Sequence, residues 1–189
     1  MRTMHLALLP ALLLALTGCA EMFGNKDAYQ PGDPLGTYHV VGTKTSSQCG
    51  EGALGATPTW EFDVDLARED GVLYWDNGAQ VLTGAIKEDG VTFSIDATVV
   101  VDMRTEATVG YPPCSVERRD AARGALAAPG DDVKAFSATL RYDFAPTTGS
   151  QCADLVLGAP TDLPGEPVFG ALPCGIVYDL AGTRTAEPE

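Results

Sequence analysis

Residues 59–66 read TWEFDVDL, an unbroken alternation of apolar and polar side chains, and residues 91–101 read VTFSIDATVVV in largely the same pattern. A period of two is typical of a β-strand that buries one face and exposes the other. Two further apolar segments lie between these runs, Val72–Asp76 and Gln80–Ile86. The breaks are the residue pairs most favoured in tight hairpin turns, namely Asp70-Gly71, Asn77-Gly78 and Asp89-Gly90. The stretch therefore predicts four antiparallel strands joined in sequence order.

The segments on either side of this meander extend the same fold. Thr37–Thr43, Val133–Phe144 and Cys174–Leu180 alternate as strands do, whereas Ser115–Leu126 fits either a strand or a helix. Residues 145–173 are rich in Pro and Gly and indicate long loops. The sequence predicts an all-β fold, a single antiparallel domain of eight or nine strands over residues 36–184. A meander of this size closes into a barrel or folds into a sandwich, because an open sheet would leave exposed edges.

The N-terminus has the pattern of an export signal. Leu6–Leu16 is an apolar run too short to span a bilayer as a helix, and Leu16-Thr17-Gly18-Cys19 follows it. The last four residues resemble the lipobox of bacterial lipoproteins. That resemblance implies a signal peptide over residues 1–18, cleavage before Cys19, and acylation of Cys19 by fatty acids such as palmitate. Several acyl chains anchor a protein firmly in a membrane.

The anchored chain is expected in the cell envelope. Residues 19–35 are polar and rich in Gly, Pro and Asp, which indicates a flexible tether, and residues 185–189 form a short C-terminal tail. Ala20 and Glu21 follow the cysteine. By the sorting rule of Gram-negative lipoproteins, the absence of Asp beside Cys19 predicts that the protein is anchored in the outer membrane. The sequence does not distinguish the periplasmic face of that membrane from the surface face.

Net charge restricts the binding partners that we expect, and the cysteine content predicts disulfides. The formal net charge is −14, so nucleic acid and anionic lipid head groups are not expected to bind. Beyond Cys19, four cysteines remain, which predicts two disulfides in an exported chain. Of the three possible pairings we expect Cys49–Cys114 and Cys152–Cys174, because the last two flank one loop-rich excursion.

Two short features lie at the start and the end of the predicted domain. Gly36-Thr37-Tyr38 opens the first predicted strand, and Arg184 lies just after the last one. These two features resemble those of lipocalins and related calycins, which begin with Gly-x-Trp and close with an arginine that packs over that ring. This chain departs from the pattern, since it has Tyr38 in place of Trp. The resemblance implies an eight-stranded up-and-down barrel with a cup for a small apolar ligand.

No motif predicts catalysis, a cofactor or a metal site. His39 is the only histidine outside the signal peptide, and its place within a strand favours a structural role. Glu61, Asp63 and Asp65 share one strand face, where a straight row of carboxylates is too extended to surround a cation. We therefore expect a solvated acidic face and no enzymatic activity.

Other polar and aromatic features have similarly plain explanations. Tyr74 and Trp75 are adjacent in a strand and should point to opposite faces. Arg118, Arg119 and Arg123 form the only basic cluster, which predicts a charge-balanced surface or a grip on an anion.

The interior is expected to be fully packed, because the residues predicted to point inward are large. They are Trp60, Phe62, Val64, Phe93, Ile95, Phe136, Leu140, Tyr142 and Tyr178. Recognition would then fall to the loops around residues 44–58 and 145–173. The sequence predicts a lipid-anchored binding or structural module of the envelope, acting on an unnamed envelope protein or small ligand. The alternatives are a calycin-like carrier of a small hydrophobic ligand and, third, an envelope hydrolase.

Overall fold

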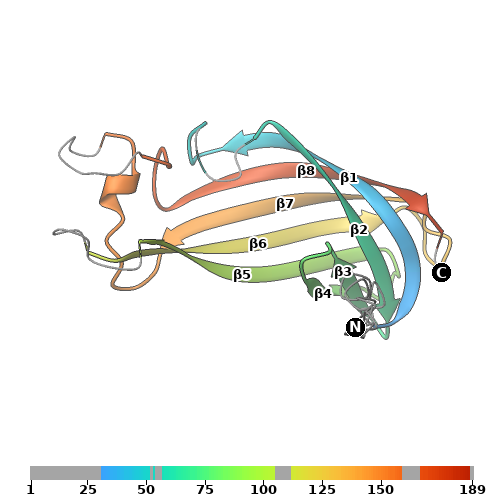
Figure 1. Ribbon diagram of the computed structural model, residues 1–189. Coiled ribbons are helices and arrows are strands. Elements are labelled where there is room, and N and C mark those ends of the chain that lie inside the picture. The colour runs from blue at the N-terminus through green and yellow to red at the C-terminus, as the bar shows by residue number, and fades with distance from the viewer. Residues whose placement is uncertain (1–30, 52, 54–56, 105–111, 159–166, 188–189) are drawn as a thin grey trace, which may run out of the picture.

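The computed structural model describes residues 31–51, 53, 57–104, 112–158 and 167–187 (Figure 1). The predicted signal peptide, Cys19 and the predicted tether up to residue 30 lie outside the described residues. Within them, no helix is long and apolar enough to cross a membrane. The elements are β1 (Asp33–Ser47), β2 (Thr59–Glu69), β3 (Val72–Asp76), β4 (Val81–Ile86), β5 (Thr92–Arg104), β6 (Cys114–Leu126), β7 (Ala135–Pro146), the 3₁₀ helix η1 (Ala153–Leu155) and β8 (Cys174–Ala186).

The eight strands form a closed antiparallel barrel in sequence order, with β8 paired to β1. The predicted all-β fold is confirmed, and closure shows that it is a barrel rather than a sandwich. Residues 115–126, which also fitted a helix, lie in β6 and pair with a strand on both sides. β1 begins at Asp33 and β8 ends at Ala186, so the sheet extends beyond both predicted domain limits. Leu35 was predicted to belong to the flexible tether because its neighbours are polar, but its side chain is fully buried.

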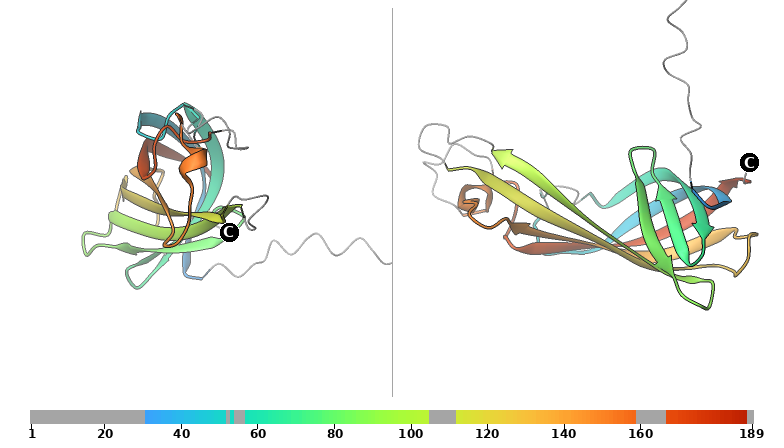
Figure 2. Two further views of the ribbon diagram at one scale, coloured as in Figure 1. Left: turned by 90° about the vertical axis from the view of Figure 1, so that its left-hand side faces the viewer. Right: turned by 90° about the horizontal axis from the view of Figure 1, so that it is seen from below.

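The two ends of the barrel differ. The turns β2–β3, β4–β5 and β6–β7 lie at one end, together with the start of β1 and the end of β8 (Figure 1). The connections β1–β2, β5–β6 and β7–β8 lie at the other, and η1 crosses this end in the left view of Figure 2. Phe169 and Leu155 of the β7–β8 connection are buried there, with Phe169 5.6 Å from Phe144 between ring centroids. The long loops predicted to recognise a ligand thus include segments that cover one end of the barrel.

Both disulfides are present, but the predicted pairing is wrong. The bonds join Cys49 to Cys174 and Cys114 to Cys152. Barrel closure brings the end of β1 beside the start of β8, where Ser47 is the register partner of Ile176. Cys49 therefore meets Cys174, 125 positions away, rather than the predicted partner Cys114.

The tightly packed part of the core lies toward the end with the short turns, around Phe136. Its ring centroid is 5.6 Å from that of Tyr38, 5.3 Å from Trp75 and 6.1 Å from Phe93. All four side chains are buried. The ring of Phe136 fits against β8 because residue 182 is glycine, where a Cβ atom would collide with it.

Candidate functional site: a cup in the barrel wall

The barrel wall is shorter along the strand direction at β3 and β4 than at the neighbouring strands. These strands have five and six residues, whereas β2 has eleven and β5 thirteen. β3 covers β2 only over Asp65–Glu69, and β4 covers β5 only over Phe93–Ile95. Among the described strands, residues 59–64 of β2 pair with β1 alone, and residues 96–102 of β5 pair with β6 alone. The pairing leaves a side opening beyond the β3–β4 hairpin, where a pocket enters the barrel. Figure 2 shows from below that this hairpin is shorter than the long strands of the barrel.

The turn at Asn77-Gly78 determines where β3 ends and β4 begins, and so how far this part of the wall extends. The Oδ1 atom of Asn77 accepts hydrogen bonds from the backbone N–H groups of Ala79 and Gln80, at 3.0 and 3.1 Å. Gly78 has φ of +79°, a conformation that side chains disfavour. The chain thus reverses directly after Asp76, and both strands stop short of their neighbours.

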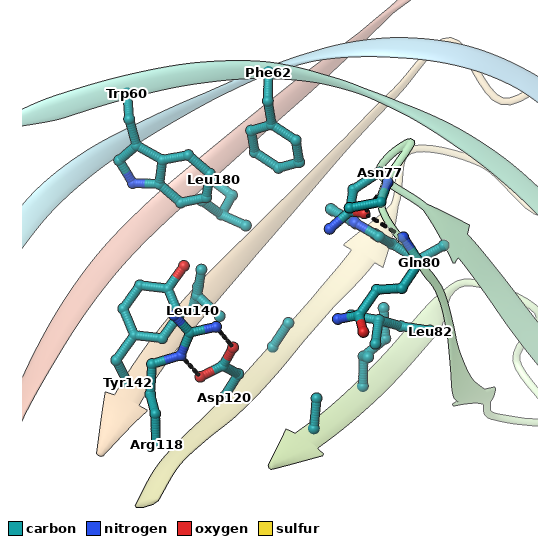
Figure 3. Close-up of a pocket in the computed structure, with 15 residues that line it drawn as sticks. Trp60, Phe62, Asn77, Gln80, Leu82, Arg118, Asp120, Leu140, Tyr142 and Leu180 are labelled. Atoms are coloured by element: carbon teal, nitrogen blue, oxygen red, sulfur yellow. Dashed lines mark hydrogen bonds and ion pairs between the residues drawn. The ribbon is translucent and has the colours of Figure 1, made fainter. Parts of the chain in front are cut away.

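Behind the opening is a cup of about 330 Å³ in the barrel interior (Figure 3). This finding contradicts the expectation of a fully packed interior. Of the residues predicted to point inward, Val64, Phe93, Ile95, Phe136, Leu140 and Tyr178 are buried, but Trp60, Phe62 and Tyr142 are only partly covered. The short β3–β4 hairpin explains the difference, because Trp75 of β3 and Leu82 of β4 line the cup but both strands end before they could close it.

Aromatic side chains from β2 form one wall of the cup. Trp60 and Phe62 stack with ring centroids 4.7 Å apart and an angle of 14° between their planes. Tyr178 meets Trp60 edge-on at 5.7 Å. Trp75, which points inward from β3, also lines the cup. Trp60 and Trp75 are the two tryptophans of the chain, so all of its tryptophan fluorescence comes from residues that line this cup.

An ion pair from β6 lies on the opposite side (Figure 3). Arg118 donates from Nε and Nη2 to the two carboxylate oxygens of Asp120, at 2.8 and 2.7 Å. The guanidinium carbon also lies 5.1 Å from the centre of the Tyr142 ring. Burial raises the pKa of the Asp120 carboxyl, although the hydrogen bond and charge of Arg118 act in the opposite direction. Burial raises the pKa of Tyr142 to about 12, so its hydroxyl is neutral near pH 7.

The basic cluster predicted from the sequence is divided between the two faces of β6. Arg118 points into the cup, while Arg119 and Arg123 are on the outer surface and pair with Glu117 and Asp96. Sequence reasoning did not identify the inward position of Arg118 and Asp120, because residues 115–126 also fitted a helix. Counting in twos from the apolar Val116 to Ala122 would have placed both inside.

The acidic row and His39 lie on the outer surface. His39 Nδ1 is 2.9 Å from Oδ1 of Asp63, and Nε2 is 3.6 Å from a carboxylate oxygen of Glu61. The hydrogen bond with Asp63 raises the pKa of His39. Asp65 accepts a hydrogen bond from the hydroxyl of Thr37. In the part of the chain that the structure describes, no three His, Cys, Asp or Glu side chains gather closely enough to hold a metal ion.

Tyr74 and Trp75 occupy opposite faces, as strand geometry predicts. Trp75 is buried in the barrel, while Tyr74 is half-buried on the other face. The two points of the lipocalin resemblance lie side by side, because Tyr38 of β1 is the register partner of Arg184 of β8. Both side chains are shielded from solvent. Gly36 is needed beside them, since it has a φ of +112° and a Cβ atom there would lie 2.5 Å from the backbone oxygen of Ala186.

Comparison with protein-family models, with curated proteins and with solved structures finds no match to this chain.

Proposed function

We propose that this protein is a lipid-anchored envelope protein that binds a small molecule in the side cup of its barrel, without catalysing a reaction. The observation that carries the proposal is the cup of about 330 Å³ lined by partly exposed aromatic side chains. Ligand sites are typically concave and mostly apolar, with a few polar groups that orient the ligand. The cup has this composition, since Trp60 and Phe62 face a single ion pair.

This proposal is closer to the calycin-like carrier of a small ligand than to a purely structural module. A structural barrel is stabilised by filling its interior, because cavities cost packing energy. Here the aromatic rings of Trp60, Phe62 and Tyr142 remain partly exposed inside the opening. The neighbouring positions of Tyr38 and Arg184 are also compatible with a calycin-like carrier.

A neutral fluorescent probe tests binding. N-phenyl-1-naphthylamine should quench the tryptophan emission of the purified protein by energy transfer, with a Kd in the micromolar range, on the order expected for a ligand of this size. Ala97→Phe places a ring inside the cup, where Ala97 is a lining residue, and should weaken binding at least tenfold. Thr98→Phe adds the same ring to the exposed face of β5 and is the matched control. Equal binding by both variants would place the probe elsewhere.

The anchor is tested separately at Cys19. Cys19→Ser removes the thiol to which the lipid would be attached, so the variant should lose palmitate label and leave the membrane fraction or accumulate as an uncleaved precursor. Cell fractionation with mass spectrometry of the N-terminus measures both effects. Retention of label and membrane association by Cys19→Ser would refute the anchoring proposal and leave the binding proposal standing.

A further inference from the structure

The electrostatics of the cup restrict the charge of its ligand. Among the described residues that line it, only Arg118 and Asp120 carry a formal charge at neutral pH. Their side chains have opposite charge, so the lining is neutral as a whole. The remaining polar side-chain groups of the lining are uncharged: the amides of Asn77 and Gln80, the hydroxyl of Tyr142 and the indole N–H groups of the two tryptophans.

The charges of Arg118 and Asp120 already neutralise each other in an ion pair. The Arg118–Asp120 pair is bidentate, the strongest arrangement of a guanidinium with a carboxylate. The side chains are 35% and 18% exposed, so both are partly withdrawn from water. A charged ligand would have to separate this pair or enter the cup without a counter-charge, and burying an unpaired charge is strongly unfavourable.

The cost of burying an unpaired charge applies to both anionic and cationic ligands. An anion would also meet the field of a chain with a net charge of −14. A cation would be attracted by that field at long range, but inside the cup it would approach the guanidinium of Arg118, which lies over the ring of Tyr142. One face of that ring is therefore already covered by a cation.

The remaining surface suits aromatic rings. Trp60 and Phe62 lie on one side of the cup and Tyr142 on the other (Figure 3). Stacking and edge-to-face contacts with such side chains add to the burial of apolar area. The Nη1 group of Arg118, which has no acceptor among the described side chains, can donate a hydrogen bond to a hydroxyl or carbonyl oxygen.

We infer that the ligand of the cup is an uncharged compound built on aromatic rings, with a hydroxyl or carbonyl group that hydrogen-bonds beside the Arg118–Asp120 pair. This inference rests on the proposed binding function and adds the chemical class of the ligand.

Three naphthalene derivatives of similar size test the class on the purified protein. They are 2-naphthol, which is neutral at pH 7, 2-naphthoate, an anion, and 2-naphthylmethylammonium, a cation. Isothermal titration calorimetry should give 2-naphthol a Kd at least tenfold lower than either charged probe, and 2-naphthol should quench the tryptophan emission. Tighter binding of a charged probe would overturn the inference while leaving the binding function intact. Binding of none of the three would count against both.

A variant that unpairs Arg118 tests the physical cause. Asp120→Asn keeps the shape of the side chain and leaves the guanidinium without its carboxylate. The Kd of 2-naphthoate divided by the Kd of 2-naphthol should then fall at least tenfold, because the unpaired guanidinium can pair with the carboxylate of the anionic probe. Glu117→Gln unpairs Arg119 on the outer face of the same strand and should leave this ratio unchanged. An unchanged preference in a folded Asp120→Asn protein would overturn the inference, and the wild-type ranking decides it if that variant does not fold.

Discussion

Replacing Phe136 by alanine is expected to lower the free energy of unfolding by about 3–5 kcal/mol, the range for removing a large buried ring. Phe136 contacts three other aromatic side chains, those of Tyr38, Trp75 and Phe93. Its ring also fills the space left by Gly182 on β8. The cavity would lie where strands from both halves of the barrel converge, so neighbouring groups cannot collapse into it without moving the sheet. Chemical denaturation at equilibrium, followed by far-ultraviolet circular dichroism, measures the change.

Phe62→Ala is the matched comparison for this prediction. It removes the same ring from the side of the cup, where Phe62 is only partly buried. Because that ring already borders an opening, its loss exposes less new surface, and the free energy of unfolding should fall by less than half as much as in Phe136→Ala. Similar losses in the two variants would mean that the cup is as tightly packed as the core around Phe136.

Removing the Cys49–Cys174 disulfide is expected to cost more stability than removing the Cys114–Cys152 disulfide. The two bonds close loops of 125 and 38 residues in the unfolded chain. In the chain-entropy model these loops correspond to about 5 and about 4 kcal/mol. The double variants Cys49→Ala/Cys174→Ala and Cys114→Ala/Cys152→Ala should therefore differ by about 1 kcal/mol in the free energy of unfolding.

Alanine is the suitable replacement because all four cysteines are buried, and a serine hydroxyl would need a new hydrogen-bond partner. Both double variants lose the same atoms, so the difference between them reports on loop length. Guanidinium denaturation of each variant, beside non-reducing peptide mapping of the wild type, gives the measurement. A larger loss from the shorter loop would show that local strain or packing, rather than chain entropy, controls the contribution of these bonds.

The amino-acid sequence by itself determined the local structure of this protein. The alternation in residues 59–66 and the Asp-Gly and Asn-Gly pairs predicted the β2–β5 meander, because strand periodicity and turn geometry depend on residues close together in the chain. The even number of cysteines beyond Cys19 predicted two disulfides for a similar reason, since it needs only a count. The opposite faces of Tyr74 and Trp75 also follow from neighbouring positions alone.

Only the tertiary structure decided which distant residues meet. The pairing of Cys49 with Cys174 depends on closure of β8 onto β1, which no local pattern encodes. The cup depends on a comparison of strand lengths, because a short β3–β4 hairpin leaves an opening only when β2 and β5 extend past it. Arg118 and Asp120 enter the cup because β6 pairs with strands on both sides and so alternates through its full length. Each of these features arises from contacts across the barrel, whose geometry is set by the closed sheet as a whole.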